Sequence, residues 1–317
     1  MPTSFPKEFA DADPILKGGS GRQFFRVALH DGQHAVLCRY DDSREENALY
    51  ADIADFLAKI GFPVPRVLAR DDNARTLLLE DLGATDLLAL RTAPAPERMA
   101  AQRSALAALA HLHNSALAQW QAAGPTRPKL MPAFDAALYR WEQDYFWERT
   151  AVAVFNQPCL TPPPALRAEL DALAGRLLRL PAQLVHRDCQ SQNILWHDGA
   201  ARFIDFQGMR IGTGFYDLGS FLFDPYTSFS ESERDALLDF YRACGGGATL
   251  TPAEFLQAFL DASAQRLMQA LGAYGFLGLQ KGRREFLAHI PSALANLRAV
   301  TEQNPLLPHL RQTTARF

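Results

Sequence analysis

The chain has 317 residues, of which 48% are hydrophobic and 21% are charged, with a formal net charge of -3. This composition excludes disordered, collagen-like and coiled-coil chains, and the charge does not point to nucleic acid or an anionic membrane as a partner. No apolar run reaches the roughly 18 residues of a membrane span, and residues 1–14 lack the features of a signal peptide. Four widely spaced cysteines indicate neither a disulfide framework nor a zinc site. We therefore expect a soluble, cytoplasmic globular protein of two lobes or one large domain.

The first 80 residues predict a small sheet with one helix. The runs 24–29 and 35–40 are rich in β-forming residues and flank an Asp-Gly turn, which is typical of a hairpin. Apolar residues at helical spacing follow the acidic pair Glu45-Glu46, and Gly61 is placed to end that helix. Two more strands are expected at 66–70 and 76–80.

After Gly83 the apolar residues recur mainly at helical spacing. The helical patterns cover 97–120, 134–145, 166–177, 256–271 and 286–297. Between residues 183 and 204 this period stops, and short apolar runs around the turn His197-Asp198-Gly199 predict a hairpin. The sequence thus predicts an α+β protein with a small β-rich lobe, residues 1–82, and a larger, mainly helical lobe, residues 83–317.

Two short segments carry residues suited to phosphoryl transfer. Residues 186–193 read H-R-D-C-Q-S-Q-N and residues 204–207 read I-D-F-Q, so an acid on a loop is followed by an amide five residues later and by a second acid after a hairpin. In phosphoryl transfer one carboxylate orients and deprotonates the attacking hydroxyl, while an Asn and an Asp hold Mg²⁺ against the nucleotide phosphates. A lone Asp–Asn pair is ordinary turn chemistry, but here spacing and residue types agree together, which makes the pattern specific.

These segments resemble the kinase superfamily, in its aminoglycoside-phosphotransferase-like branch of small-molecule kinases. The resemblance implies a bilobal protein-kinase-like fold and the cofactors ATP and Mg²⁺. It also implies that Asp188 is the catalytic base and that Asn193 and Asp205 are metal ligands.

The resemblance extends over almost the whole chain. Residues 77–83, L-L-L-E-D-L-G, resemble the hinge between the lobes of that branch, where the backbone of Glu80, Asp81 and Leu82 is expected to meet the adenine edge. Residues 216–219, Y-D-L-G, resemble a helix start whose aspartate, Asp217, anchors the catalytic loop.

Other segments are similar to the anomeric N-acetylmuramate/N-acetylglucosamine kinases of cell-wall recycling. Residues 19–26, G-S-G-R-Q-F-F-R, match their S-x-R-x-[YF]-x-R phosphate-loop segment, and both H-R-D-x-Q-S-x-N and D-F-Q match their catalytic and metal motifs. The stretch 269–291 also resembles theirs. This likeness implies an amino sugar as the small-molecule substrate, phosphorylated at its anomeric hydroxyl.

Three weaker features bear on the nucleotide site. Glycines around Ser20 and Arg22 precede the first strand of the hairpin, and in a kinase-like lobe these two residues become candidate phosphate contacts. Strand 35–40 lacks the nucleotide-binding lysine of most kinases, and we expect Arg39 in that strand to be solvated. Glu46 is then either the carboxylate that would have paired with such a lysine or a first-turn acid that complements the helix dipole.

Other functions stay open on the sequence alone. The alternatives to an amino sugar as acceptor are an aminoglycoside, choline, homoserine or another amino alcohol. The missing lysine also fits a catalytically silent nucleotide-binding regulator, although the intact Asp188, Asn193 and Asp205 argue against it. A protein kinase is disfavoured, because only nine residues separate Gln207 from Asp217, too few for an activation segment of roughly twenty residues.

Overall fold

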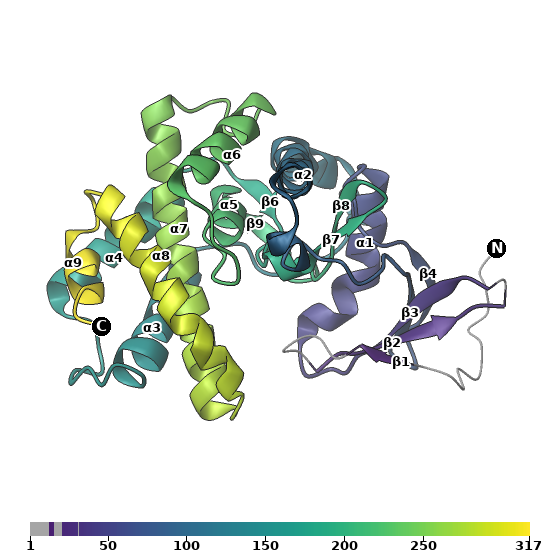
Figure 1. Ribbon diagram of the computed structural model, residues 1–317, viewed down its shortest axis with the longest axis horizontal. Helices are drawn as coiled ribbons and strands as arrows, with labels where there is room; N and C mark the ends of the chain where they lie inside the picture. Colours follow the sequence, from purple (N-terminus) through teal and green to yellow (C-terminus); the bar gives the residue numbers. More distant parts are fainter. Residues whose placement is uncertain (1–12, 16–20, 31) are drawn as a thin grey trace. The chain divides into compact units, whose positions relative to one another are not determined.

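The structure is a computed structural model that describes residues 13–15, 21–30 and 32–317 (Figure 1). The chain divides into two compact units: the first contains the described residues up to Met131 together with Gln192–Met209, and the second contains Pro132–Ser191 and Arg210–Phe317. The fold is α+β, as predicted, with an antiparallel sheet in the N-terminal part and a helical C-terminal part. The boundary between lobes that the sequence predicts after residue 82 differs from this division into units, and it stays a prediction. No helix in the described ranges is both long and apolar enough to cross a membrane.

Five antiparallel strands form the sheet of the first unit, in the order β1-β2-β3-β5-β4. They are β1 (Asp13–Ile15), β2 (Gln23–Ala28), β3 (His34–Arg39), β4 (Val67–Asp71) and β5 (Thr76–Glu80). The four predicted strands lie within one residue of their expected bounds, and β1 was not predicted. Phe25, Leu37 and Leu78 stand opposite one another on neighbouring strands and pack on one face of the sheet. Because side chains alternate, Phe24 and its partner Cys38 lie on the other face.

The helices of the first unit begin with a 3₁₀ helix, Glu45–Leu49, that leads into α1 (Tyr50–Lys59). Helix α1 buries Ile53 and Leu57, and Gly61 follows it with a φ of 78°, the left-handed geometry that glycine adopts at no steric cost. Helix α2 (Ala95–Ala122) comes next, between 3₁₀ helices at Ala89–Thr92 and Gly124–Thr126.

A predicted hairpin completes the first unit: β7 (Ile194–His197) pairs with β8 (Ala200–Phe203). Its turn residues Asp198 and Gly199 both have positive φ, at 51° and 72°. A two-residue turn of this kind fits the twist of the flanking strands, which is why Asp-Gly is a reliable hairpin signal.

The second unit is helical, with one two-stranded ribbon in which β6 (Gln183–Val185) pairs with β9 (Arg210–Gly212). Its helices are α3 (Ala136–Phe146), α4 (Pro164–Leu177), α5 (Phe215–Leu222), α6 (Glu231–Ala243), α7 (Pro252–Gly275), α8 (Ile290–Gln303) and α9 (Pro308–Thr314). Two π-helical turns, Trp147–Val152 and Phe276–Gln280, continue α3 and α7, and a 3₁₀ helix, Arg284–His289, precedes α8. The predicted helices are all present, with the last pattern beginning four residues later as an α-helix.

Glycines allow the helices of the second unit to approach closely. A Cβ atom on Gly219 of α5 would lie 2.7 Å from the Cα of Ser263 on α7, and one on Gly275 would lie 2.1 Å from the backbone oxygen of Arg149. Neither position has room for a side chain, so each must be glycine. Helix α5, all of whose residues are buried, therefore packs directly against the backbone of α7.

Candidate active site

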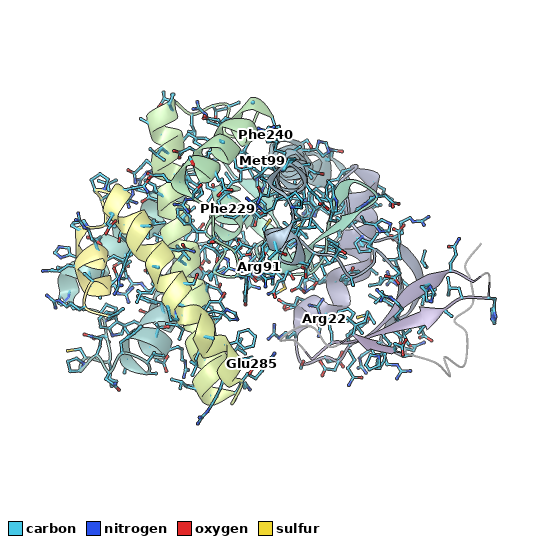
Figure 2. All side chains as sticks on the ribbon, viewed as in Figure 1. Arg22, Arg91, Met99, Phe229, Phe240 and Glu285 are labelled. Atoms are coloured by element: carbon cyan, nitrogen blue, oxygen red, sulfur yellow. The ribbon has the colours of Figure 1, made fainter. Side chains whose placement is uncertain are left out.

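Arg26 of β2 (Gln23–Ala28) and Arg22, the residue before the strand, are four positions apart and fall on the same side as Phe24, because side chains alternate along extended chain. Arg26 forms two hydrogen bonds with the carboxylate of Asp81, at 2.6 and 3.0 Å. Arg22, labelled in Figure 2, donates to the carboxylate of Asp205, and its guanidinium lies 5.6 Å from the ring centre of Phe24. The S-x-R-x-F-x-R segment thus connects the sheet to two predicted site residues of the same unit. Ser20, the other phosphate-contact candidate, lies outside the described residues.

Strand β3 supplies no lysine, and the side chain that it buries opposite Phe24 is Cys38. Cys38 of β3 is 2% exposed, and burial raises the pKa of its thiol to about 11, so the thiol is neutral at physiological pH. Arg22 is close enough to Cys38 to oppose that rise. The cation beside Asp205 therefore comes from the residue before β2 and not from β3. Arg39 is exposed, as predicted, and lies over the ring of Phe25 at 5.4 Å.

The two predicted metal ligands lie on adjoining backbone segments. The amide of Ile204, the residue before Asp205, donates to the carbonyl of Asn193 at 2.9 Å, and Asp205 itself has a φ of 65°. Gln207 donates through Nε2 to Asp205 Oδ1 at 2.7 Å, and its own Oε1 is buried with no hydrogen-bond partner among the described residues. Carboxylate and amide oxygens are the ligands that Mg²⁺ prefers, and the orphaned Oε1 would accept from a metal-bound water. The residues present therefore fit a hard divalent cation.

The hinge candidates are held by neighbouring side chains. Asp81 accepts from Arg26 and from the amide of Gly83, and these bonds outweigh burial and lower the pKa of its carboxyl. Glu80 accepts from the backbone and side chain of Arg66, which likewise outweighs burial and lowers its pKa. Leu82 is 3% exposed. The acidic side chains of this segment thus fix its path, and any contact with adenine falls to its backbone.

Glu46 lies in the 3₁₀ helix before α1 and pairs with Arg44 at 3.4 Å. Strand β3 supplies no lysine with which Glu46 could pair. Its role at the nucleotide stays a prediction. All described candidates for nucleotide and metal binding belong to the first unit, whereas Asp188 belongs to the second.

The catalytic-base candidate, Asp188, lies between two guanidinium groups. Its Oδ2 is 3.4 Å from Nη1 of Arg187, and its Oδ1 is 3.4 Å from Nη2 of Arg266. The Asp188 side chain is 30% exposed, so its carboxylate is accessible from outside the protein.

Two buried aspartates fix the backbone of the loop that carries Asp188. Asp217 of α5 accepts from the amides of His186 and Arg187, at 2.7 and 2.8 Å, which is the anchoring role that the resemblance implied. Asp224 accepts from the amide of Ser191 at 2.7 Å, from its hydroxyl at 2.5 Å, and from the amide of Tyr226 at 3.1 Å. Asp224 thus ties the end of the loop to the segment that follows α5.

The sequence reasoning missed a polar network beneath this loop. Glu142 of α3 accepts from the Tyr216 hydroxyl and from Nε2 of Gln265, both at 2.9 Å, and burial raises the pKa of its carboxyl. Arg266 follows Gln265 on α7 and is 78 residues away from Asp188 in the chain. The one available signal was the pair Gln265-Arg266 within an otherwise apolar stretch of helix, which indicates buried polar side chains with partners.

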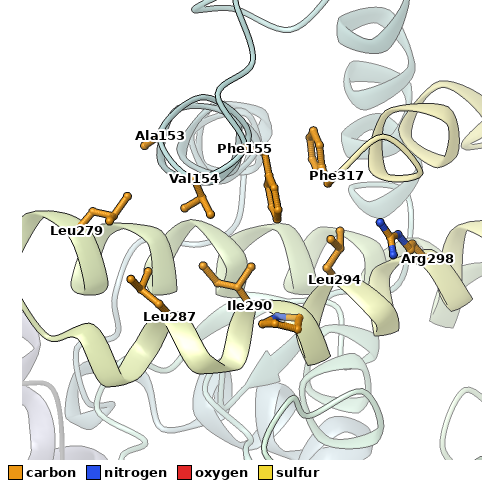
Figure 3. A pocket seen from close by; sticks show the side chains of 10 residues that line it. Ala153, Val154, Phe155, Leu279, Leu287, Ile290, Leu294, Arg298 and Phe317 are labelled. Atoms are coloured by element: carbon orange, nitrogen blue, oxygen red, sulfur yellow. The ribbon is translucent and has the colours of Figure 1, made fainter.

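Cys189, next to Asp188, is fully buried, and burial raises the pKa of its thiol well above the usual value. It is an apolar filler, as the sequence indicated. A separate cavity of about 490 Å³ lies in the second unit and is lined by apolar side chains, including Phe155 and Phe317, together with Arg298 (Figure 3). No predicted site residue lines it, so it is not the candidate active site.

An N-terminal antiparallel sheet, a helical C-terminal part, and an H-R-D-x-x-x-x-N loop followed by D-F-Q together define a kinase-like phosphotransferase. The chain belongs to the phosphotransferase enzyme family, whose pattern matches residues 11–256. Membership implies a nucleoside triphosphate donor and a divalent metal ion.

Named relatives and solved structures agree with this assignment. The chain is 26% identical to an N-acetylmuramate/N-acetylglucosamine kinase of Pseudomonas aeruginosa, covering 96% of this chain and 88% of that protein. It is also 26% identical to a protein of the same name from Neisseria meningitidis serogroup B, covering 96% and 89%.

A choline/ethanolamine kinase family protein from Mesorhizobium loti has a similar fold, with a TM-score of 0.61 at 18% identity over 95% of this chain and 92% of that one. An amicoumacin kinase solved with AMP-PNP and Ca²⁺ also has a TM-score of 0.61, at 14% identity over 93% and 90%. These likenesses confirm the predicted protein-kinase-like fold.

Proposed function

We propose that the protein transfers the γ-phosphoryl group of ATP, with Mg²⁺, to the anomeric hydroxyl of N-acetylmuramate or N-acetylglucosamine. The observation that carries the mechanism is the carboxylate of Asp188, accessible to substrate on a loop fixed by Asp217 and flanked by two guanidinium groups. The acceptor is taken from the relatives in Pseudomonas aeruginosa and Neisseria meningitidis, each of which matches 96% of this chain.

In this proposal Asp188 orients the acceptor hydroxyl and takes its proton as the phosphoryl group is transferred. An anomeric hydroxyl is more acidic than an ordinary alcohol, so a positioned carboxylate is a sufficient base. Asn193 and Asp205 would hold Mg²⁺, which supplies charge neutralisation at the phosphates. Ser20 and Arg22 would contact the phosphates, and the backbone of residues 80–82 would meet the adenine.

An aromatic cluster beside the catalytic loop suits an acceptor with an apolar face, such as a sugar ring. Tyr226, whose amide is bonded to Asp224, packs on His289 with ring centres 4.5 Å apart, and Tyr274 lies 6.1 Å from Tyr226. Such rings suit either the apolar C–H face of a pyranose or a quaternary ammonium group. Arg283, however, already lies over the ring of Phe286, another member of the cluster, at 4.6 Å. Arg283 is itself paired with Glu285 at 3.0 Å, so this edge of the cluster carries no uncompensated charge and the cluster accommodates a neutral sugar ring.

The test is an ATP-consumption assay with N-acetylmuramate, N-acetylglucosamine, an aminoglycoside, choline and homoserine as acceptors. We expect turnover with the two amino sugars and a loss of about 10²- to 10⁴-fold in kcat on Asp188→Ala, the range for removal of a general base. Asp171→Ala is the matched control, because Asp171 also pairs with an arginine in the second unit, Arg140, at 2.7 Å but lies outside the proposed site.

Two outcomes would contradict the proposal at different levels. Turnover of choline or homoserine alone would refute the amino-sugar acceptor while leaving Asp188 as the base. Nucleotide binding without turnover of any acceptor would instead identify a catalytically silent regulator.

A further inference from the structure

Arg266 is a buried cation that ends beside an accessible carboxylate. Its side chain is 5% exposed, whereas that of Asp188, 3.4 Å from its Nη2, is 30% exposed. Removing a guanidinium group from water is costly unless hydrogen bonds and an opposite charge compensate. The groups that compensate the buried charge of Arg266 therefore indicate what this residue does.

The other donors of Arg266 are fixed by two helices. Its Nε donates to Ser220 Oγ on α5 at 3.1 Å, and its Nη1 donates to Gln269 Oε1, one turn further along α7, at 2.5 Å. The guanidinium also lies 5.9 Å from the ring centre of Tyr216 on α5. With Nε and Nη1 engaged, Nη2 has a set direction, and that direction is toward Asp188.

The catalytic loop itself offers Asp188 a second cationic partner, Arg187, which is less constrained than Arg266. Residues 189–193 contain no cation, and Arg187, which faces the other oxygen of Asp188, has a side chain that is 21% exposed. Each oxygen of the carboxylate thus faces one guanidinium, but the one from α7 is the more deeply buried. Helix α5 contributes twice, because Asp217 holds the loop backbone and Ser220 holds Arg266.

We propose that Arg266 is a positioning residue that orients the carboxylate of Asp188 for its role as the base. Arg266 acts through Asp188 and does not contact the substrate. This inference rests on the proposed function only in taking Asp188 as the base, and it does not depend on the identity of the acceptor.

A double-mutant cycle tests the proposal with Arg266→Met, Asp188→Asn and the double variant. We expect Arg266→Met to lower kcat about 10²-fold, a loss within the range for impaired general-base catalysis, with the KM for ATP unchanged. In the Asp188→Asn background the same substitution is expected to cause no further loss, because a residue that acts through another has no separate effect once that residue is gone. Arg266→Lys, which keeps the charge, is expected to retain more activity than Arg266→Met.

Arg176→Met is the matched control. Arg176 of α4 forms two hydrogen bonds with Asp261 of α7, at 2.7 and 2.8 Å, and lies outside the catalytic loop. We expect it to lower the unfolding temperature with kcat unchanged. Thermal unfolding of every variant shows that it is folded, and if Arg266→Met fails to fold, the cycle is run with Arg266→Lys.

The role of Arg266 would be overturned by either of two results. One is an equal fold-change in kcat on Arg266→Met in the wild-type and Asp188→Asn backgrounds, and the other is an unchanged kcat in folded Arg266→Met. If the wild-type protein phosphorylates neither amino sugar, the acceptor proposal has failed, and the cycle is measured on whichever acceptor is used or on the slow transfer to water. Non-additivity between Arg266 and Asp188 there would still support positioning.

Discussion

Asp217 bonds two consecutive amides of the catalytic loop and is itself fully buried. An asparagine at this position would direct an NH₂ group at one of those amides, so one buried donor would lose its acceptor. We predict that Asp217→Asn lowers the free energy of unfolding by about 1–3 kcal/mol, the cost of an unsatisfied buried group bonded to a charged partner. Chemical denaturation measures this change, and kcat should fall with it as the loop loosens. A variant with wild-type stability would show that the two bonds contribute nothing.

At the scale of single residues, the sequence singles out candidates wherever the chemistry depends on local spacing. Asp188 and Asn193 come from one motif, Asp205 from a second and the anchor Asp217 from a third. Arg266 is not singled out, because its relation to Asp188 exists only after α5 and α7 have packed, and no short-range pattern encodes that contact. The pairing of Arg22 with Asp205 was likewise invisible, since these residues are 183 positions apart.

At the scale of elements, the close approach of α5 to α7 has a measurable requirement. We predict that Gly219→Ala lowers the free energy of unfolding by about 1–3 kcal/mol, as overpacking does, because its Cβ would lie 2.7 Å from Ser263 Cα. Separation of the helices should also move Ser220, and with it Arg266, so kcat should fall as well. Gly175→Ala in α4 is the control: its Cβ meets only the end of Arg179 at 3.7 Å, and we expect about 0.5–1 kcal/mol of stabilisation. If both substitutions changed the free energy of unfolding in the same direction, this account would be wrong.

The periodic elements were predictable and the irregular ones were not. Alternating apolar residues and an Asp-Gly turn predicted β2, β3 and the hairpin of β7 and β8, since both signals are local. The π-helical turns after α3 and α7 leave no such signal. The end of α7 fits against the backbone of Arg149 because Gly275 lacks a side chain. This contact arises from tertiary packing and cannot be read from the local sequence. The predicted helix after residue 45 also begins as a 3₁₀ helix, Glu45–Leu49, before it continues as α1.

At the scale of the whole molecule, the candidate residues divide by task. The described nucleotide and metal candidates belong to the first unit, and Asp188 with its positioning residues belongs to the second. In the proposed function, nucleotide binding and base catalysis should therefore be separable by substitution.

We predict that Asp188→Ala retains the stabilisation of the protein by MgATP, while Asp205→Ala loses most of it. A ligand at 100 times its Kd stabilises the folded state by about 2.7 kcal/mol, so a thermal shift assay resolves the difference. Hydrogen exchange locates it: MgATP should slow exchange in β2, β3 and the hairpin of β7 and β8 in the wild type and in Asp188→Ala alike. Equal loss of protection in both variants would mean that Asp188 takes part in nucleotide binding, and the division of tasks between the two units would be wrong.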